Sequence, residues 1–210
     1  MSPPHEFAVS DSETLHVGRI LAVRLDQVVM PGGGVARREI VEHPGAVAIL
    51  PLHDDATVVM IDQYRHAVGR RLRELPAGLL DTAGEDPVST ARRELVEEVG
   101  CTAQDWSVLV DVVSSPGFSD EAVRVFLARG LTEIGRPAGD DGEEADLSVV
   151  RVPLADAVRQ VLAGEIVNAS TVAGLLAAQA VLAGTAQPRP VDASWPDRPT
   201  RFADRAGTPR

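Results

Sequence analysis

Three glutamates lie close together in the stretch GEDPVSTARRELVEEVG, residues 84–100. Glu94, Glu97 and Glu98 are spaced by three and four residues, so on a helix of 3.6 residues per turn they occupy an arc of about 100°. Like charges at this spacing cost roughly a few tenths of a kcal/mol each when exposed, and more beside a core. Hard divalent cations prefer oxygen ligands and bridge carboxylates to phosphates, so a metal–phosphate site would offset the repulsion. The alternative is a solvated acidic helix face.

The residues around these acids predict the helix that positions them. Four apolar residues recur at steps of three or four and share one face: Val88, Ala91, Leu95 and Val99. Pro87 suits the first helical turn and Gly100 suits the end. Arg93 is one i,i+4 step from Glu97 and can hold that carboxylate in place.

The first part of the chain is predicted to be an antiparallel β extension. Two segments with strand character, GRILAVRLDQVVM and VARREIVEH, flank PGGG, whose glycines permit the positive backbone angles of a tight turn. We interpret this pattern as a hairpin. The extension is assigned to residues 1–44, and Pro44-Gly45 marks its boundary.

Residues 45–185 are predicted to form the main domain. Strand character is found in AVAILPL, TVVMIDQY, WSVLVDVV, AVRVFLARG and residues 148–152, whereas PLADAVRQVLAG and NASTVAGLLAAQAVLAG resemble helices. AVAILPL is apolar enough to be central in a sheet. Because strands and helices are mixed without regular alternation, the predicted fold class is α+β. Residues 186–210 are rich in proline and charge, so we expect a disordered or loosely draped tail.

The composition restricts location and partners. The chain has 20 basic and 31 acidic residues, and its formal net charge of −11 disfavours nucleic-acid backbones and anionic membranes as partners. No stretch approaches the ~18–20 apolar residues of a membrane span, and the N-terminal residues lack a secretory pattern. The single cysteine, Cys101, fits a reducing compartment and is expected to be a small buried residue. We therefore expect a cytoplasmic protein that binds neither nucleic acid nor membrane.

The acidic helix and its flanks resemble the Nudix hydrolase signature. That signature runs Gly, five residues, Glu, seven residues, Arg-Glu, apolar, any, Glu-Glu, any, Gly, apolar. The matching residues are Gly78, Glu85, Arg93, Glu94, Leu95, Glu97, Glu98, Gly100 and Cys101. One departure is that six residues, 79–84, separate Gly78 from Glu85 where the signature has five. The interval from Glu85 to Arg93 is intact, which keeps the helical half in register. The resemblance covers roughly residues 45–165.

This resemblance implies a fold, a reaction and a metal. The fold would be a mixed β-sheet sandwiched between helices, and the reaction would be cleavage of a nucleoside diphosphate linked to another group. The cofactor would be Mg²⁺, with Mn²⁺ as an alternative. Glu94 and Glu98 would bind the metal directly, Glu97 directly or through water, and the backbone carbonyl of Ala77 would complete the set.

Two stretches resemble the ADP-ribose pyrophosphatase branch of the family. SPGFSDE, residues 115–121, places Pro116 sixteen residues beyond Gly100, as is typical of that branch, although an ordinary Pro-Gly turn is the alternative. QYRHAVGRRLRELPAG, residues 63–78, concentrates arginines whose guanidinium groups suit phosphate oxygens, although each alone could be a surface arginine. The substrate-binding residues implied are Arg65, Arg73, Glu74, Pro116, Phe118 and Glu121.

The resemblance also implies a catalytic base on a loop. GEEAD, residues 142–146, precedes the strand at 148–152. A carboxylate on a loop that closes over the substrate can take a proton from the attacking water. Glu143 is the first candidate and Glu144 the second, and Glu97 completes the catalytic set. An acidic loop without a catalytic role is the alternative.

The leading hypothesis is Mg²⁺-dependent hydrolysis of ADP-ribose, a small-molecule nucleoside diphosphate, to AMP and ribose 5-phosphate. One rival is hydrolysis of another nucleoside diphosphate sugar or a dinucleotide, and the other is a non-catalytic module that senses ADP-ribose. Relatives use an extension like residues 1–44 to form an intertwined dimer, so the resemblance implies a homodimer whose partner chain helps to build the substrate pocket.

Overall fold

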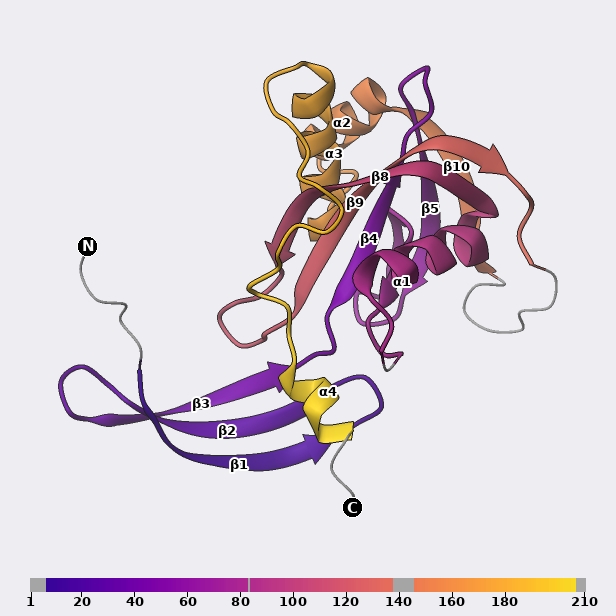
Figure 1. Ribbon diagram of the computed structural model, residues 1–210. Helices are drawn as coiled ribbons and strands as arrows, with labels where there is room; N and C mark the ends of the chain where they lie inside the picture. Colours follow the sequence, from indigo (N-terminus) through magenta and orange to yellow (C-terminus); the bar gives the residue numbers. More distant parts are fainter. Residues whose placement is uncertain (1–6, 83, 138–145, 207–210) are drawn as a thin grey trace.

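The computed structural model describes residues 7–82, 84–137 and 146–206. A three-stranded sheet at the N-terminal end lies beside a larger body that contains the remaining strands and most of the helices (Figure 1). The fold is therefore α+β, as predicted. No helix in these three ranges is both long and apolar enough to cross a membrane.

The N-terminal sheet is antiparallel in the order β1-β2-β3. It consists of β1 (Val9–Val17), β2 (Ala22–Val29) and β3 (Val35–Glu42). The pairing of β2 with β3 confirms the predicted hairpin. β1 was not predicted, because its residues VSDSETLHV are all exposed and show little apolar alternation.

A four-stranded sheet in the order β7-β4-β9-β8 lies at the centre of the larger body. β4 (Ala46–Pro51) is buried at every residue and runs parallel to β9 (Ala122–Glu133), as expected for a strand covered on both faces. β7 (Ala77–Leu79) and β8 (Cys101–Val113) pair with β4 and β9 in the antiparallel sense. The sheet is therefore mixed, as the resemblance implied.

A second three-stranded sheet, in the order β10-β5-β6, packs beside the four-stranded sheet. It is formed by β5 (Thr57–Arg65), β6 (Arg70–Glu74) and β10 (Ser148–Pro153). Two helices follow β10 along the chain, α2 (Leu154–Leu162) and α3 (Ala169–Leu182). β5, β10 and the helix pair confirm the elements predicted for this part of the sequence, whereas β6 was not predicted.

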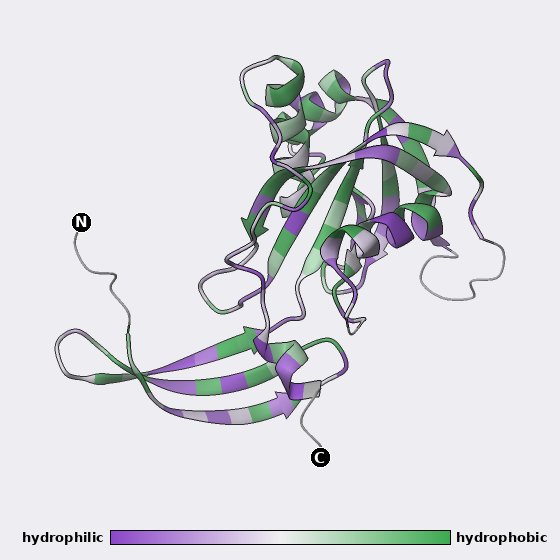
Figure 2. Ribbon diagram, viewed as in Figure 1, coloured by the Kyte–Doolittle hydropathy of each residue, from purple (hydrophilic) through white to green (hydrophobic). Residues whose placement is uncertain are grey.

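Helices cover opposite faces of the central sheet because apolar side chains alternate along β4. Ala48 and Leu50 belong to the apolar cluster that includes residues of α2 and α3. Val47 and Ile49 belong to a second cluster that includes Ala91 of α1. Figure 2 shows hydrophobic residues concentrated in the strands of the larger body. This arrangement holds α1 firmly against one face of the sheet.

The helix of the acidic motif changes its winding before it ends. α1 (Pro87–Glu94) begins at Asp86, whose carboxylate accepts hydrogen bonds from the amides of Val88 and Ser89. The next residues form a π-helical turn, η1 (Leu95–Val99), where the sequence predicted a regular helix. Wider π-helical turns are often found at functional sites. Here the wider turn carries Glu97 and Glu98.

Gly100 ends this turn in a conformation and a space that favour glycine. Its φ is 73°, and an added Cβ would lie 2.5 Å from the backbone nitrogen of Arg136 and 2.5 Å from the carbonyl carbon of Gly135. We expect Gly100→Ala to lower the free energy of unfolding by at least about 2 kcal/mol, because left-handed strain adds to backbone overlap. Urea unfolding measures this loss. Gly69→Ala is the control. Its φ is also positive, at +72°, but its added Cβ would meet no atom within 4 Å, so a smaller loss of unfolding free energy is expected.

The C-terminal segment differs from the predicted disordered or loosely draped tail. Arg189 forms a β-bridge with Val108, and its guanidinium pairs with Asp111 at 2.9 Å. The segment ends in α4 (Arg201–Ala206), which lies against the N-terminal sheet (Figure 1). Composition was a poor guide for residues 186–206, because Arg189 and Arg205 have carboxylate partners elsewhere in the fold.

Candidate metal and phosphate site

The three acids of the motif lie at the junction of α1 and η1. Glu94 and Glu98 are buried, with 8% and 5% of their surfaces exposed. The side chain of Glu97 is 37% exposed. Burial of ionised carboxylates is costly unless charge or hydrogen bonds stabilise them. A solvated acidic helix face therefore does not describe Glu94 and Glu98.

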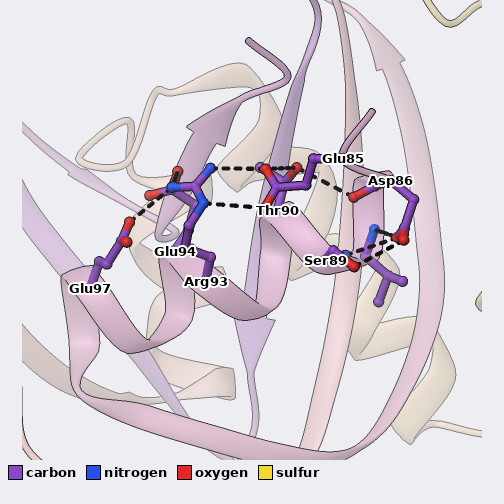
Figure 3. A network of polar contacts seen from close by, with 8 residues as sticks. Glu85, Asp86, Ser89, Thr90, Arg93, Glu94 and Glu97 are labelled. Atoms are coloured by element: carbon purple, nitrogen blue, oxygen red, sulfur yellow. Dashed lines mark hydrogen bonds and ion pairs between the residues drawn. The ribbon is translucent and has the colours of Figure 1, made fainter. Parts of the chain in front are cut away.

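Arg93 connects Glu85, Glu94 and Glu97 (Figure 3). Its Nη1 donates to Oε1 of Glu94 at 2.7 Å and to Oε2 of Glu97 at 2.8 Å. Its Nη2 donates to Oε2 of Glu85 at 3.2 Å. Burial alone would lower the pKa of Arg93, but these carboxylates raise it overall. The predicted contact between Arg93 and Glu97 is confirmed.

Glu85 supports this arrangement from the loop before α1. It pairs with Arg93, and its Oε2 also accepts a hydrogen bond from the Thr90 hydroxyl at 2.9 Å. The hydrogen bond from Arg93 lowers the pKa of Glu85 below its usual range. Glu85 matches the motif in the sequence, but its role could not be predicted there. Arg93 lies eight positions further along the chain, and α1 brings its Nε to 3.3 Å from Oε1 of Glu85.

Strand β7 forms the opposite wall of the site. The amide of Ala77 donates to Oε2 of Glu98 at 2.9 Å, which places this residue beside that acid. The Ala77 carbonyl as a metal ligand stays a prediction. A Cβ added to Gly78 would lie 2.1 Å from Oε1 of Glu94 and 2.4 Å from its Cγ. The observed position of the Glu94 side chain against β7 therefore leaves room only for glycine at position 78, which gives a reason for a motif residue that had no assigned role.

The donor set fits a hard divalent cation. Carboxylate oxygens of Glu94, Glu97 and Glu98 and the carbonyl of Ala77 are oxygen ligands, which Mg²⁺ prefers. In the ranges that the structure describes, no three acidic, histidine or cysteine side chains converge closely enough to hold an ion. This matches the contacts above, in which Arg93 and the Ala77 amide hold carboxylate oxygens. Mg²⁺ commonly uses one or two carboxylates together with water and substrate phosphates, so a three-carboxylate cage is not required.

The structure separates the two arginines predicted to bind substrate. Side chains alternate along a strand, so Arg65 and Glu74 lie on the face of the sheet shared by Ile61, which packs with α1. Arg65 Nη2 donates to the buried Glu74 carboxylate at 2.6 Å. Arg73 lies on the opposite face, where it pairs with Asp62 at 2.9 Å and reaches Gln160 of α2. Arg65 and Glu74 thus share a sheet face with the acids, and Arg73 does not.

The predicted substrate loop, residues 115–121, is hydrogen-bonded to the N-terminal extension. The amide of Val41 donates to the carbonyl of Phe118 at 2.7 Å, and the amide of Asp120 donates to the carbonyl of Val41 at 3.2 Å. Glu121 lies 3.9 Å from His43. Phe118 is exposed. This loop, which also contains Pro116, is therefore held against the N-terminal extension.

The candidate bases Glu143 and Glu144 lie outside the described residues. The described chain resumes after them at Asp146, which pairs with Arg71. Their assignment remains a prediction from the sequence.

Comparisons with known proteins agree with this geometry. Residues 42–173 match the NUDIX domain family model. The chain is 59% identical to the ADP-ribose pyrophosphatase of Mycobacterium tuberculosis (strain ATCC 25618 / H37Rv) over 96% of this chain and 97% of that protein. It is 39% identical to the ADP-ribose pyrophosphatase of Bacillus subtilis (strain 168), over 76% of this chain and 85% of that protein.

A solved structure has the same fold. It is described as an ADP compounds hydrolase and superimposes with a TM-score of 0.72 and 25% sequence identity, over 88% of this chain and 98% of that chain. The family model covers the acidic helix, the strand that packs against it and the central sheet. With its buried carboxylates, its glycine at position 78 and these relatives, the chain belongs to the Nudix hydrolase family.

Proposed function

We propose that this protein hydrolyses ADP-ribose to AMP and ribose 5-phosphate with Mg²⁺ as cofactor. The burial of Glu94 and Glu98 against β7 is the structural observation that carries the proposal, because it places two acids where a cation and a diphosphate would offset their cost. The choice of ADP-ribose is supported by the two relatives named as ADP-ribose pyrophosphatases.

The residues of this chain have distinct roles in the proposal. Glu94 and Glu98 bind the metal directly, Glu97 binds it directly or through water, and the Ala77 carbonyl adds a further oxygen. A divalent cation held by these residues would neutralise diphosphate charge and make the attacking water easier to deprotonate. Arg93 keeps the carboxylate of Glu97 oriented, since their atoms lie 2.8 Å apart.

Proton removal and substrate contacts complete the proposal. Glu143 takes the proton from the attacking water, with Glu144 as the alternative base. Arg65 is the preferred residue to bind the diphosphate, because it lies on the sheet face that packs against the helix carrying the acids. Glu74 supports Arg65 through their ion pair. Arg73 is a weaker candidate within one chain, because it packs towards α2.

In a homodimer, the predicted substrate loop of one chain could complete the pocket of its partner. Pro116, Phe118 and Glu121 lie on the loop held by the N-terminal extension. We propose that residues 1–44 form the dimer contact and that the partner chain completes the pocket. We also propose a cytoplasmic location, on the basis of composition. Elution as a monomer that retains full activity would contradict the dimer.

A substrate panel tests the proposed activity. Phosphate-containing products are separated by chromatography after incubation with ADP-ribose, ADP-glucose, GDP-mannose, NADH, FAD or a diadenosine polyphosphate, each with and without Mg²⁺. The proposal predicts the highest kcat/KM for ADP-ribose and no product after metal removal with EDTA. A relative named GDP-mannose pyrophosphatase, 32% identical over 65% of this chain, makes GDP-mannose the most informative competitor. Tight ADP-ribose binding without any metal-dependent product would instead indicate a sensing module.

Gly78→Ala tests the close packing of β7 on Glu94. The added methyl group would overlap the Glu94 carboxylate, so that side chain must move, while φ at this position imposes no left-handed strain. We expect kcat to fall roughly 10²-fold, because small displacements of catalytic groups have effects of this size. The free energy of unfolding should change little. Gly34→Ala is the control, since no atom lies within 4 Å of its added Cβ, and equal kinetics for both variants would contradict the role of Gly78.

A further inference from the structure

The C-terminal segment is bound at three successive places along the fold. The first is the larger body, where Arg124 Nη1 donates to the Ala193 carbonyl at 2.7 Å and the Arg124 guanidinium lies 4.8 Å from the centroid of the Trp195 ring. The second is the boundary of the extension, where Pro199 is buried and its Cδ lies 3.2 Å from a Cβ built on Gly45. The third is the N-terminal sheet, which Arg205 reaches.

Arg205 binds one buried carboxylate of the N-terminal sheet. Glu42 is 1% exposed, and its two oxygens accept hydrogen bonds from Nε and Nη2 of Arg205, the latter at 2.9 Å. Arg205 Nη1 also donates to the Thr14 hydroxyl at 2.9 Å. Arg24 supplies a second guanidinium to Glu42 at 2.7 Å and pairs with Asp26. The cluster is therefore balanced, with two cations and two anions.

Glu42 lies between Val41 and His43, the two residues that are hydrogen-bonded to the substrate loop. Val41 exchanges backbone hydrogen bonds with Phe118 and Asp120 on one side of it. On the other side, the amide of His43 donates to Oδ1 of Asp120 at 2.8 Å. A shift of Glu42 therefore moves the backbone that supports loop 115–121.

We infer that Arg205 is a positioning residue for the substrate loop: through Glu42 it holds residues 41–43, and these place Phe118 and Glu121. The inference rests on the proposed function, in which this loop contacts ADP-ribose. The side-chain hydrogen bonds of Arg205 go to Glu42 and Thr14 of the N-terminal sheet. Its effect is expected on substrate binding and not on the chemical step.

Arg205→Met in the full-length chain tests this inference. We expect KM for ADP-ribose to rise roughly three- to tenfold, with kcat changed less than about twofold, because uniform binding is lost without a change in the metal site. Arg205→Lys keeps the charge but not the paired guanidinium contact, so its KM should lie between those of the wild-type protein and Arg205→Met. Arg159→Met is the matched control, because it removes an exposed arginine–carboxylate pair on α2, and it should leave KM and kcat unchanged.

Amide hydrogen exchange provides a readout independent of activity. In Arg205→Met the amides of Val41, His43 and Asp120 should exchange faster, since each donates a hydrogen bond across this junction, while that of Ile49 in β4 should not change. Unchanged exchange at the three amides would overturn the inference, and so would faster exchange with an unchanged KM. If the wild-type chain did not hydrolyse ADP-ribose, the proposed function would fail, and the exchange rates would still decide whether Arg205 holds the loop. If Arg205→Met does not fold, Arg205→Lys decides by the same criteria.

Discussion

Glu98→Gln is expected to lose roughly 10³-fold in kcat with the fold retained, because a metal ligand contributes several kcal/mol of transition-state stabilisation. The glutamine amide oxygen can still accept the hydrogen bond that the Ala77 amide donates to Glu98, so the contact between η1 and β7 can persist. The substitution removes the charge and leaves the shape. Steady-state kinetics with ADP-ribose measures the loss, and circular dichroism confirms the fold.

Two comparisons make this result specific. Glu165→Gln removes one carboxylate charge from an exposed position and should keep wild-type turnover. The affinity for Mn²⁺, measured by calorimetry, should fall in Glu98→Gln and stay constant in the control. Turnover near the wild-type value in Glu98→Gln would reject the assignment of Glu98 as a metal ligand.

Glu143→Gln is expected to reduce kcat by roughly 10²- to 10⁴-fold, the usual contribution of a general base, with a much smaller change in KM. Glutamine cannot take a proton from the attacking water, but it leaves the metal ligands and substrate contacts intact. The same change at the neighbouring acid, Glu144→Gln, is the matched comparison. If Glu144→Gln shows the loss and Glu143→Gln does not, the base is Glu144. If neither variant loses turnover, the base lies outside this loop.

The catalytic helix could be predicted from the sequence because its signals are local. Pro87, Gly100 and the apolar spacing between them lie within one short stretch, and the contact of Arg93 with Glu97 spans a single turn. The π-helical geometry of η1 could not be predicted from this pattern. It is linked to the left-handed Gly100 and to its packing against residues 135–136, which are distant along the chain.

The parts that differed from prediction depend on contacts between remote residues. Glu42 and Arg205 are 163 positions apart, and neither the charged tail nor the polar strand β1 reveals such partners in its own composition. The orientation of Arg73 depends on strand register: one step along β6 separates it from Glu74 and turns it to the opposite face. The arginine-rich sequence alone could not show that Arg65 and Arg73 lie on opposite faces of the sheet.

The most direct test of the metal–pyrophosphate site is a crystal grown with Mn²⁺ and a nonhydrolysable ADP-ribose analogue. Anomalous scattering locates the manganese independently of the protein density. We predict manganese bound by Glu94 and Glu98, within coordination distance of the pyrophosphate oxygens. Pyrophosphate bound elsewhere, with no manganese beside these carboxylates and with their contacts to Arg93 and the Ala77 amide unchanged, would contradict the account.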